Sequence, residues 1–325
     1  MSASDAAEAG GEHSPVAVLG GGVIGQSWTA LFLAAGREVR LYDPDPAVDD
    51  RVHRAVEAAW PTLRKLGLGT TDAPTWSALT VCDDPRAAVD GTGFVQESVP
   101  ERPAIKHALY AQIEDVLDPA AIVASSASGL TLSELQEGWR DPARLVLGHP
   151  FNPPHLIPLV EVMGNERTAP GVVDAARAFY HSVGKVTIEV RREVPGHVAN
   201  RLQAALWREA INLVNEGVAS VADVDTAVSA GPGLRRAVMG PTMLFHLGAG
   251  EGGIGAFCER YSDSFNRWWD DLGTPHLDDA TADRLVAAMS APGSRSIDDL
   301  AAERDALLTQ VVAATQQWRE DDSST

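Results

Sequence analysis

Cysteine is scarce in this chain, whose 325 residues include only Cys82 and Cys258, far apart and in no spacing typical of metal ligands. A disulfide framework is therefore excluded, which predicts a protein of the reducing cytoplasm. Long apolar runs are missing too, since no stretch approaches the roughly 20 residues needed to span a bilayer. Residues 1–14 lack the basic start and apolar run of a signal peptide. We therefore expect a cytoplasmic protein without membrane association. Residues 1–14 are expected to form a disordered N-terminal extension.

Positive charge is also in short supply. The 26 Lys and Arg residues stand against 45 Asp and Glu residues, for a formal net charge of −19. A surface this acidic repels phosphate backbones and anionic lipid, so we expect no nucleic-acid partner and no membrane partner. The length of the chain is sufficient for two domains of ordinary size.

The first half of the chain alternates short apolar runs with helical patterns. Val16–Leu19 and Val39–Tyr42 read as buried strands, and residues 23–35 between them favour a helix that stops at Gly36. This alternation predicts an α/β fold built on a doubly wound parallel sheet. Further strand candidates are residues 79–82, 94–97, 122–124, 145–147, 159–162 and 186–190, with helices such as 104–117 and 170–183 between them.

After Val190 the apolar residues recur at helical spacing, and no convincing strand follows. Pro195 and Gly196 mark the boundary. We predict a sheet domain over residues 15–193, a smaller all-helical domain over 194–316 and a frayed polar tail over 317–325. Helices of the second domain are expected at residues 222–229, 234–247, 255–270 and 279–290.

A glycine motif directly follows the first strand. Gly20 permits a tight turn, Gly22 allows a pyrophosphate to approach the backbone, and Gly25 allows close packing of helix on strand. Val23 and Ile24 begin the helix, whose N-terminal amides and dipole attract a phosphate. Because strand, glycines and helix follow in this order, the segment predicts a Rossmann-type site for a dinucleotide.

Asp43 stands at the end of the second predicted strand, where a carboxylate can accept hydrogen bonds from a ribose 2′-hydroxyl. Its negative charge disfavours a 2′-phosphate. The sequence therefore predicts NAD rather than NADP as the cofactor, and it predicts no metal site.

Hydride transfer requires one proton donor or acceptor, and His149 follows an apolar strand where ligands collect in open α/β sheets. Glu161 lies within another apolar strand, where a carboxylate is costly unless it is paired. A His149–Glu161 pair would orient the imidazole, but spacing alone leaves open a glutamate facing water and a structural histidine. Ser128 and Asn200 are equally open, since a turn or a helix cap explains both.

Several motifs resemble the 3-hydroxyacyl-CoA dehydrogenase superfamily, over about residues 16–308. They are His149-Pro-Phe-Asn-Pro-Pro154, Leu159-Val-Glu161 and Gly196-x-x-x-Asn200-Arg201. Within that superfamily the chain is most similar to the lambda-crystallin or L-gulonate 3-dehydrogenase branch. The segments that carry this second resemblance are residues 95–101, 157–161, 200–203, 233–235 and 240–241.

The resemblance implies a catalytic set. His149 would be the general base in oxidation and the general acid in reduction, with Glu161 orienting it. Ser128 and Asn200 would hold the substrate oxygen.

The resemblance also implies contacts to the cofactor and to a second subunit. Asn152 would lie on the nicotinamide side, while Glu101 and Lys106 would line the cofactor cleft. The helical domain would carry substrate contacts and the interface of a homodimer.

The sequence departs from the family pattern at three positions. His197 stands where an aromatic or other apolar residue is usual, Ala127 replaces a threonine, and Arg236 replaces an aromatic residue. None of these belongs to the catalytic set. The reaction type is therefore predicted more firmly than the shape of the substrate pocket.

The main prediction is an NAD-dependent dehydrogenase for a small free 3-hydroxy acid, such as one resembling L-gulonate or 3-hydroxybutyrate. Arg235 and Arg236 could bind its carboxylate, although salt bridges to the many acidic residues explain them as well. Alternatives are a 3-hydroxyacyl-CoA thioester, a polyketide-derived 3-oxo acid, and a non-catalytic NAD-binding protein.

Carnitine is a further alternative. Its trimethylammonium group would need aromatic walls, which aromatic residues of the helical domain could provide. Aromatic residues in a helical domain are more often core. The candidates are Trp207, Phe245, Tyr261, Trp268 and Trp269.

Overall fold

The computed structural model describes residues 15–69, 71–290 and 295–323, so the predicted extension over residues 1–14 lies outside it. Within these residues the chain forms two compact units. The first comprises residues 15–198 and 305–316, and the second comprises residues 199–304 and 317–323. Residues 305–316, predicted to belong to the helical domain, instead group with the first unit.

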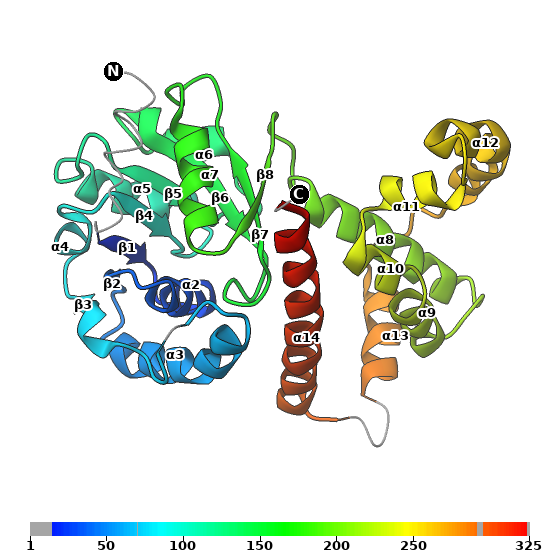
Figure 1. Cartoon of the computed structure of the whole chain (residues 1–325), viewed down its shortest axis with the longest axis horizontal. Helices are drawn as coiled ribbons and strands as arrows, with labels where there is room; N and C mark the ends of the chain where they lie inside the picture. The colour runs from blue at the N-terminus through cyan, green and yellow to red at the C-terminus, as the bar shows by residue number, and fades with distance from the viewer. Residues whose placement is uncertain (1–14, 70, 291–294, 324–325) are drawn as a thin grey trace. The chain divides into compact units, whose positions relative to one another are not determined.

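The first unit is built on one sheet of eight strands, in the order β3-β2-β1-β4-β5-β6-β7-β8 (Figure 1). Neighbouring strands are parallel except for β6 and β7, which pair antiparallel. The α/β prediction is therefore confirmed, but the sheet is not wholly parallel. The strands are β1 (Val16–Leu19), β2 (Val39–Tyr42), β3 (Leu79–Cys82), β4 (Phe94–Glu97), β5 (Ile122–Ser125), β6 (Leu145–Pro150), β7 (Leu159–Met163) and β8 (Val186–Glu189).

Hydrophobic packing covers both faces of this sheet. All four residues of β1 are buried, and they alternate between two clusters because successive side chains point to opposite faces of a strand. Val16 and Val18 join a cluster with Trp28 and Phe32, whereas Ala17 and Leu19 join the other. Burial on both faces is typical of a sheet with helices on each side.

The helices of the first unit follow the predicted alternation, with ends shifted by a few residues. The predicted helix over residues 23–35 is α2, which ends at Ala34 before Gly36 takes up a φ of 74°. The helices are α2 (Val23–Ala34), α3 (Val48–Lys65), α4 (Pro85–Val89), α5 (Pro103–Ile113), α6 (Leu132–Gln136) and α7 (Val172–Ser182), with 3₁₀ turns η1 (Trp76–Ala78) and η2 (Pro142–Arg144).

The second unit is helical, as predicted. The single helix expected over residues 234–247 is in fact two, α10 and α11, because Gly240 caps a new helix whose first residue is Pro241. The helices are α8 (Ala199–Asn215), α9 (Val221–Ala230), α10 (Pro232–Val238), α11 (Pro241–Gly248), α12 (Gly253–Asp271) and α13 (Asp279–Met289).

The last helix, α14 (Ile297–Ser323), contributes to both units. Its backbone is helical through most of the tail that the sequence predicts to be frayed. No helix in the described part of the chain is long and apolar enough to cross a membrane.

Candidate active site

The glycine motif forms a tight turn between β1 and α2. Gly20 has a φ of 99°, and a Cβ built on it would lie 2.7 Å from the backbone of Ser98. A Cβ on Gly25 would lie 1.7 Å from the carbonyl oxygen of Gly20. Gly20 must therefore be glycine both for its conformation and for this close contact, whereas Gly25 must be glycine for its close contact alone.

The other residues of this turn fit a dinucleotide. A Cβ on Gly22 would meet no atom within 4 Å, which leaves the backbone open to a ligand. Gly22 caps α2 without a side-chain hydrogen bond, so the amides of Val23 and Ile24 begin the helix facing a site with room for a phosphate. The turn thus has the shape and the donors that the NAD pyrophosphate requires.

Asp43 is held at the end of β2 by the turn itself. Its Oδ2 accepts a hydrogen bond from the amide of Gly21 at 2.7 Å, and its Oδ1 accepts one from the amide of Asp45 at 2.9 Å. A carboxylate fixed beside the glycine turn can accept from a ribose hydroxyl, so its position fits the predicted role.

His149 and Glu161 form a buried pair. The distance from His149 Nδ1 to Glu161 Oε2 is 2.8 Å, and the two residues are 5% and 0% exposed. The other oxygen of Glu161 accepts a hydrogen bond from the amide of Val198 at 2.9 Å. Because Glu161 binds Nδ1, Nε2 is the ring nitrogen that can exchange a proton with a substrate.

The sheet register produces this pair. His149 lies within β6 rather than after it as predicted, because the strand runs on to Pro150 in antiparallel pairing with β7. In that ladder His149 is directly opposite Glu161. Residues directly opposite on neighbouring strands have their Cβ atoms about 5 Å apart, which suits a hydrogen bond between a histidine and a glutamate.

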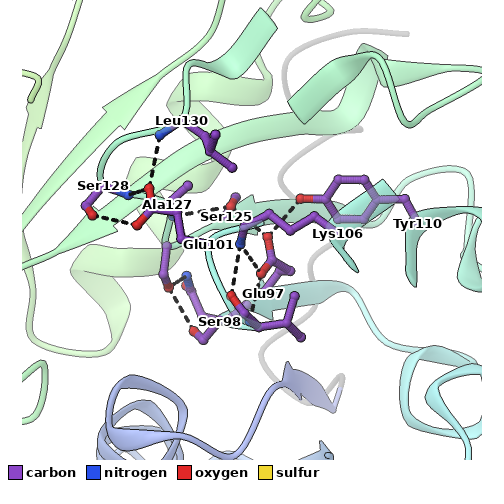
Figure 2. Close-up of polar contacts among 12 residues, drawn as sticks. Glu97, Ser98, Glu101, Lys106, Tyr110, Ser125, Ala127, Ser128 and Leu130 are labelled. Carbon is purple, nitrogen blue, oxygen red and sulfur yellow. Dashed lines mark hydrogen bonds and ion pairs between the residues drawn. The ribbon is translucent and has the colours of Figure 1, made fainter. Parts of the chain in front are cut away.

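Ser128 is bound to Glu101, a pairing that the sequence did not predict. The Ser128 hydroxyl donates to Glu101 Oε2 at 2.8 Å, and Oε1 accepts from the amides of Ser128, Gly129 and Leu130 (Figure 2). Partial burial would raise the pKa of Glu101, but these hydrogen bonds outweigh it and lower the pKa. With its proton donated to Glu101, the Ser128 oxygen can accept a hydrogen bond, and it must change partner before it can donate one.

Lys106 is buried beneath this region, in an ion pair with Glu97, which is itself 0% exposed. Glu97 also accepts hydrogen bonds from the hydroxyls of Tyr110 and Ser125, at 2.8 and 2.7 Å (Figure 2). Burial and the Glu97 carboxylate raise the pKa of Tyr110, so this hydroxyl keeps its proton. Lys106 is therefore held by Glu97 and the carbonyl of Val99, and sequence reasoning missed Glu97 altogether.

The remaining predicted site residues lie on other elements. Asn152 is exposed in the connection between β6 and β7, and Asn200 is half-buried at the start of α8. Arg235 and Arg236 are exposed on α10, and neither has an acidic partner within 4.0 Å among the described residues. Among all the residues that the structure describes, no three or more His, Cys, Asp or Glu side chains cluster as they would to hold a metal ion.

Sequence models of one family match both units. The 3-hydroxyacyl-CoA dehydrogenase NAD-binding domain matches residues 15–194, and the C-terminal domain of the same family matches residues 196–285.

Similar proteins cover almost the whole chain. It is 48% identical to an L-carnitine dehydrogenase of Streptomyces coelicolor, over 92% of this chain and 94% of the relative. It is 47% identical to an L-carnitine dehydrogenase of Streptomyces griseus subsp. griseus, over 92% and 89%. The crystal structure of 5-formyl-3-hydroxy-2-methylpyridine 4-carboxylic acid 5-dehydrogenase, an NAD⁺-dependent dismutase, matches with a TM-score of 0.82 and 31% identity, over 94% of this chain and 99% of that one.

Proposed function

The chain belongs to the 3-hydroxyacyl-CoA dehydrogenase family and is an NAD-dependent dehydrogenase acting on a CH–OH group, and we propose that its substrate is a free 3-hydroxy acid of the L-carnitine type. The product would be the corresponding 3-oxo acid. The observation that carries this proposal is the buried His149–Glu161 pair, supported by the extended similarity to L-carnitine dehydrogenases. The lambda-crystallin and L-gulonate branch stays a prediction.

In this proposal His149 is the general base. Bound NAD⁺ supplies the acceptor for the hydride that leaves C3 of the substrate. His149 Nε2 takes the proton of the C3 hydroxyl, so that the C3–O single bond becomes a double bond as the C3–H bond breaks. Glu161 Oε2 lies 2.8 Å from Nδ1 and accepts its proton in a hydrogen bond, which fixes the tautomer and stabilises the imidazolium as it forms.

The resemblance assigns further polar residues to the substrate, and this proposal keeps those roles. Ser128 and Asn200 would hold the substrate oxygen, with Ser128 first releasing Glu101 when it has to act as a donor. Arg235 and Arg236 would bind the substrate carboxylate in an otherwise strongly acidic protein. The glycine turn, Asp43 and Asn152 would hold the cofactor.

Exposed aromatic side chains in the helical unit support a substrate with a trimethylammonium group. Trp207, Tyr261, Trp268 and Trp269 are 49%, 37%, 52% and 62% exposed, so these four are not core residues within the single chain. Trp207 also lines a pocket of about 610 Å³ between α8 and α9, together with Asp225. An aromatic face near a carboxylate is the chemistry that attracts a quaternary ammonium ion.

A homodimer formed through the helical unit is part of the same proposal. Leu202 on α8 and Val286 and Met289 on α13 are each at least 60% exposed in the single chain, which leaves apolar surface for a second copy to cover. Sedimentation of the purified protein over a range of concentrations tests this assembly.

The experiment that tests the function measures NADH formation from NAD⁺. Its substrates are L-carnitine, D-carnitine, L-gulonate, 3-hydroxybutanoate and 3-hydroxybutanoyl-CoA. We expect the highest kcat/KM with L-carnitine, and loss of turnover with retained NADH binding in His149→Asn. Turnover confined to the thioester would overturn the free-acid proposal and leave the dehydrogenase chemistry intact. No turnover across the panel, together with unimpaired NADH binding, would favour a bulkier substrate or a non-catalytic protein.

A further inference from the structure

His197 is a buried histidine whose two ring nitrogens have no partner in hydrogen-bond geometry among the residues that the structure describes, although the backbone of Ala127 interacts with the ring. The residue is only 2% exposed. Buried polar atoms are nearly always hydrogen-bonded, because removing one from water without a new partner costs free energy. No other side chain in the described part of the chain buries two such atoms, since Trp28 and Trp139 contribute one nitrogen each.

The backbone at His197 is strained as well. Its φ is 50°, in the left-handed region that a bulky side chain rarely adopts. The turn is fixed by the amide of His197, which donates to the carbonyl of Val194 at 3.1 Å, and by Gly196 with a φ of 75°. Strain of this kind persists where the surrounding structure requires one orientation of a side chain, and such positions cluster at ligand sites.

This orientation places the His197 ring beside the proposed catalytic histidine. The ring centroids of His197 and His149 are 5.2 Å apart, with 55° between their planes. Burial lowers the pKa of His197 and the His149 ring lowers it further, while Glu161, the backbone of Ala127 and Glu101 act in the opposite direction without outweighing them. A neutral imidazole offers one N–H donor to a ligand.

A 3-hydroxy acid offers few atoms that could accept a hydrogen bond from the His197 N–H group. Such a substrate carries oxygen at C3 and at C1, and His149 serves the oxygen at C3. A trimethylammonium group neither donates nor accepts a hydrogen bond, so it cannot be the partner of a buried N–H group. The C1 carboxylate has two oxygens, so one of them remains as a partner for His197 beside the arginines proposed above.

We infer that His197 is a substrate-binding residue that donates a hydrogen bond to the C1 oxygen of the 3-hydroxy acid while His149 takes the proton from the C3 hydroxyl. This inference rests on the proposed free-acid substrate. It makes His197 a determinant of specificity, because a substrate without an acceptor at C1 leaves the buried N–H group unsatisfied.

Two variants test this assignment. His197→Phe removes both nitrogens and keeps a planar ring, whereas His197→Asn keeps an N–H donor on a side chain that tolerates positive φ. We expect His197→Phe to raise KM for the oxidised 3-hydroxy acid about 10- to 100-fold with a smaller change in kcat. His197→Asn should recover part of this loss. The melting temperature of His197→Phe should change little, because removing two unsatisfied buried atoms offsets the strain of a phenyl side chain at positive φ.

A binding measurement separates this inference from the identity of the substrate. Calorimetric titration of 3-hydroxybutanoate, and separately of L-carnitine, into the protein–NADH complex reports binding without turnover. We expect weaker binding of the acid in His197→Phe and an unchanged Kd for NADH. His276→Phe, which alters an exposed histidine between α12 and α13, is the matched control and should match the wild type.

The outcomes are distinct. If His197→Phe binds these acids as tightly as the wild type, or loses NADH binding and melting temperature together, His197 is structural and the inference is wrong. If L-carnitine is not oxidised but 3-hydroxybutanoate binds in a His197-dependent way, the L-carnitine proposal fails and the role of His197 stands. If neither acid binds to the wild-type complex, both fail.

Discussion

The first unit contains two glutamates that are both 0% exposed, and they differ in the partners they have. Glu97, at the end of β4, is surrounded by the Lys106 ammonium, the Tyr110 and Ser125 hydroxyls and the amide of Val99. Glu161, within β7, is bound by the imidazole of His149 and the amide of Val198. One carboxylate faces an ammonium group, and the other faces an imidazole, the side chain best suited to proton transfer near neutral pH.

This difference decides what each buried charge contributes. The ion pair between Lys106 and Glu97 is buried and holds β4 to α5. His149 can be neutral or charged, so the pair with Glu161 can support proton transfer. Burial of a carboxylate therefore does not by itself mark an active site, and the chemistry of its partner does.

Removing the charge of Glu97 should have the largest effect. Glu97→Gln leaves the buried Lys106 ammonium without a counter-ion, which typically costs about 3–5 kcal/mol. We expect a matching fall in the free energy of unfolding, measured by urea denaturation followed by tryptophan fluorescence. Glu57→Gln, on the exposed face of α3, is the control and should change little. Equal stability of the two variants would contradict the fixed ion pair.

The same substitution at Glu161 should act on activity instead. Glu161→Gln leaves no charged partner stranded, since His149 can be neutral. The new amide can donate to Nδ1, which moves the ring proton to Nε2 and removes the base. We expect kcat to fall at least about 100-fold, with NADH binding unchanged and a smaller loss of stability than in Glu97→Gln. A kcat equal to that of the wild type would show that Glu161 does not support proton transfer by His149.

Lys185 provides the converse case, a buried cation whose partners are carbonyl groups. It is 5% exposed, donates to the carbonyls of Pro154 and Ile157, and lies 5.1 Å from the Trp28 ring centroid. Burial lowers its pKa from 10.5 to about 7. Between these values the unfolded chain binds a proton that the folded chain does not, so stability rises with pH.

Titration of stability against pH tests this behaviour. One proton corresponds to about 1.4 kcal/mol per pH unit, and the carbonyls and the ring reduce that slope by stabilising the charged form. We expect the wild type to gain about 1–2 kcal/mol relative to Lys185→Met between pH 7 and pH 9, measured by urea denaturation. Parallel curves for the two proteins would show that Lys185 keeps its proton throughout this range.

Asp43 should show the smallest effect, because this carboxylate is held by backbone amides and not by a charged partner in hydrogen-bond contact. Asp43→Ala should raise KM for NAD⁺ roughly tenfold, equivalent to about 1.4 kcal/mol, and should improve the use of NADP⁺ by removing a like charge. Initial rates with each cofactor measure both changes. Asp49→Ala, a solvated acid on α3, is the control.

The fold was largely predictable because its signals are local. The apolar runs and the glycine motif identify strands and the first helix within a few residues. The break at Gly240–Pro241 was present in the sequence as a Gly-Pro pair, yet the apolar periodicity on both sides concealed it.

The site was predictable only in part, because its key contacts are between strands. The pairing of His149 with Glu161 depends on the antiparallel register of β6 and β7, and nothing in the spacing of twelve residues specifies that register. Glu97 was missed because a glutamate ending an apolar strand is ordinarily solvated, and its partners come from α5 and β5. His197 was visible only as a departure from the family pattern.

The antiparallel pairing of β6 and β7 separates two tasks along one stretch of chain. The distance between His149 and Glu161 is fixed by the ladder, whereas residues 151–158, which connect the two strands, carry other contacts. These include Asn152, proposed at the cofactor, and the carbonyls of Pro154 and Ile157, which hold Lys185. Changes in this connection should therefore alter cofactor binding and the Lys185 site, while the ladder keeps the proton-transfer pair in register.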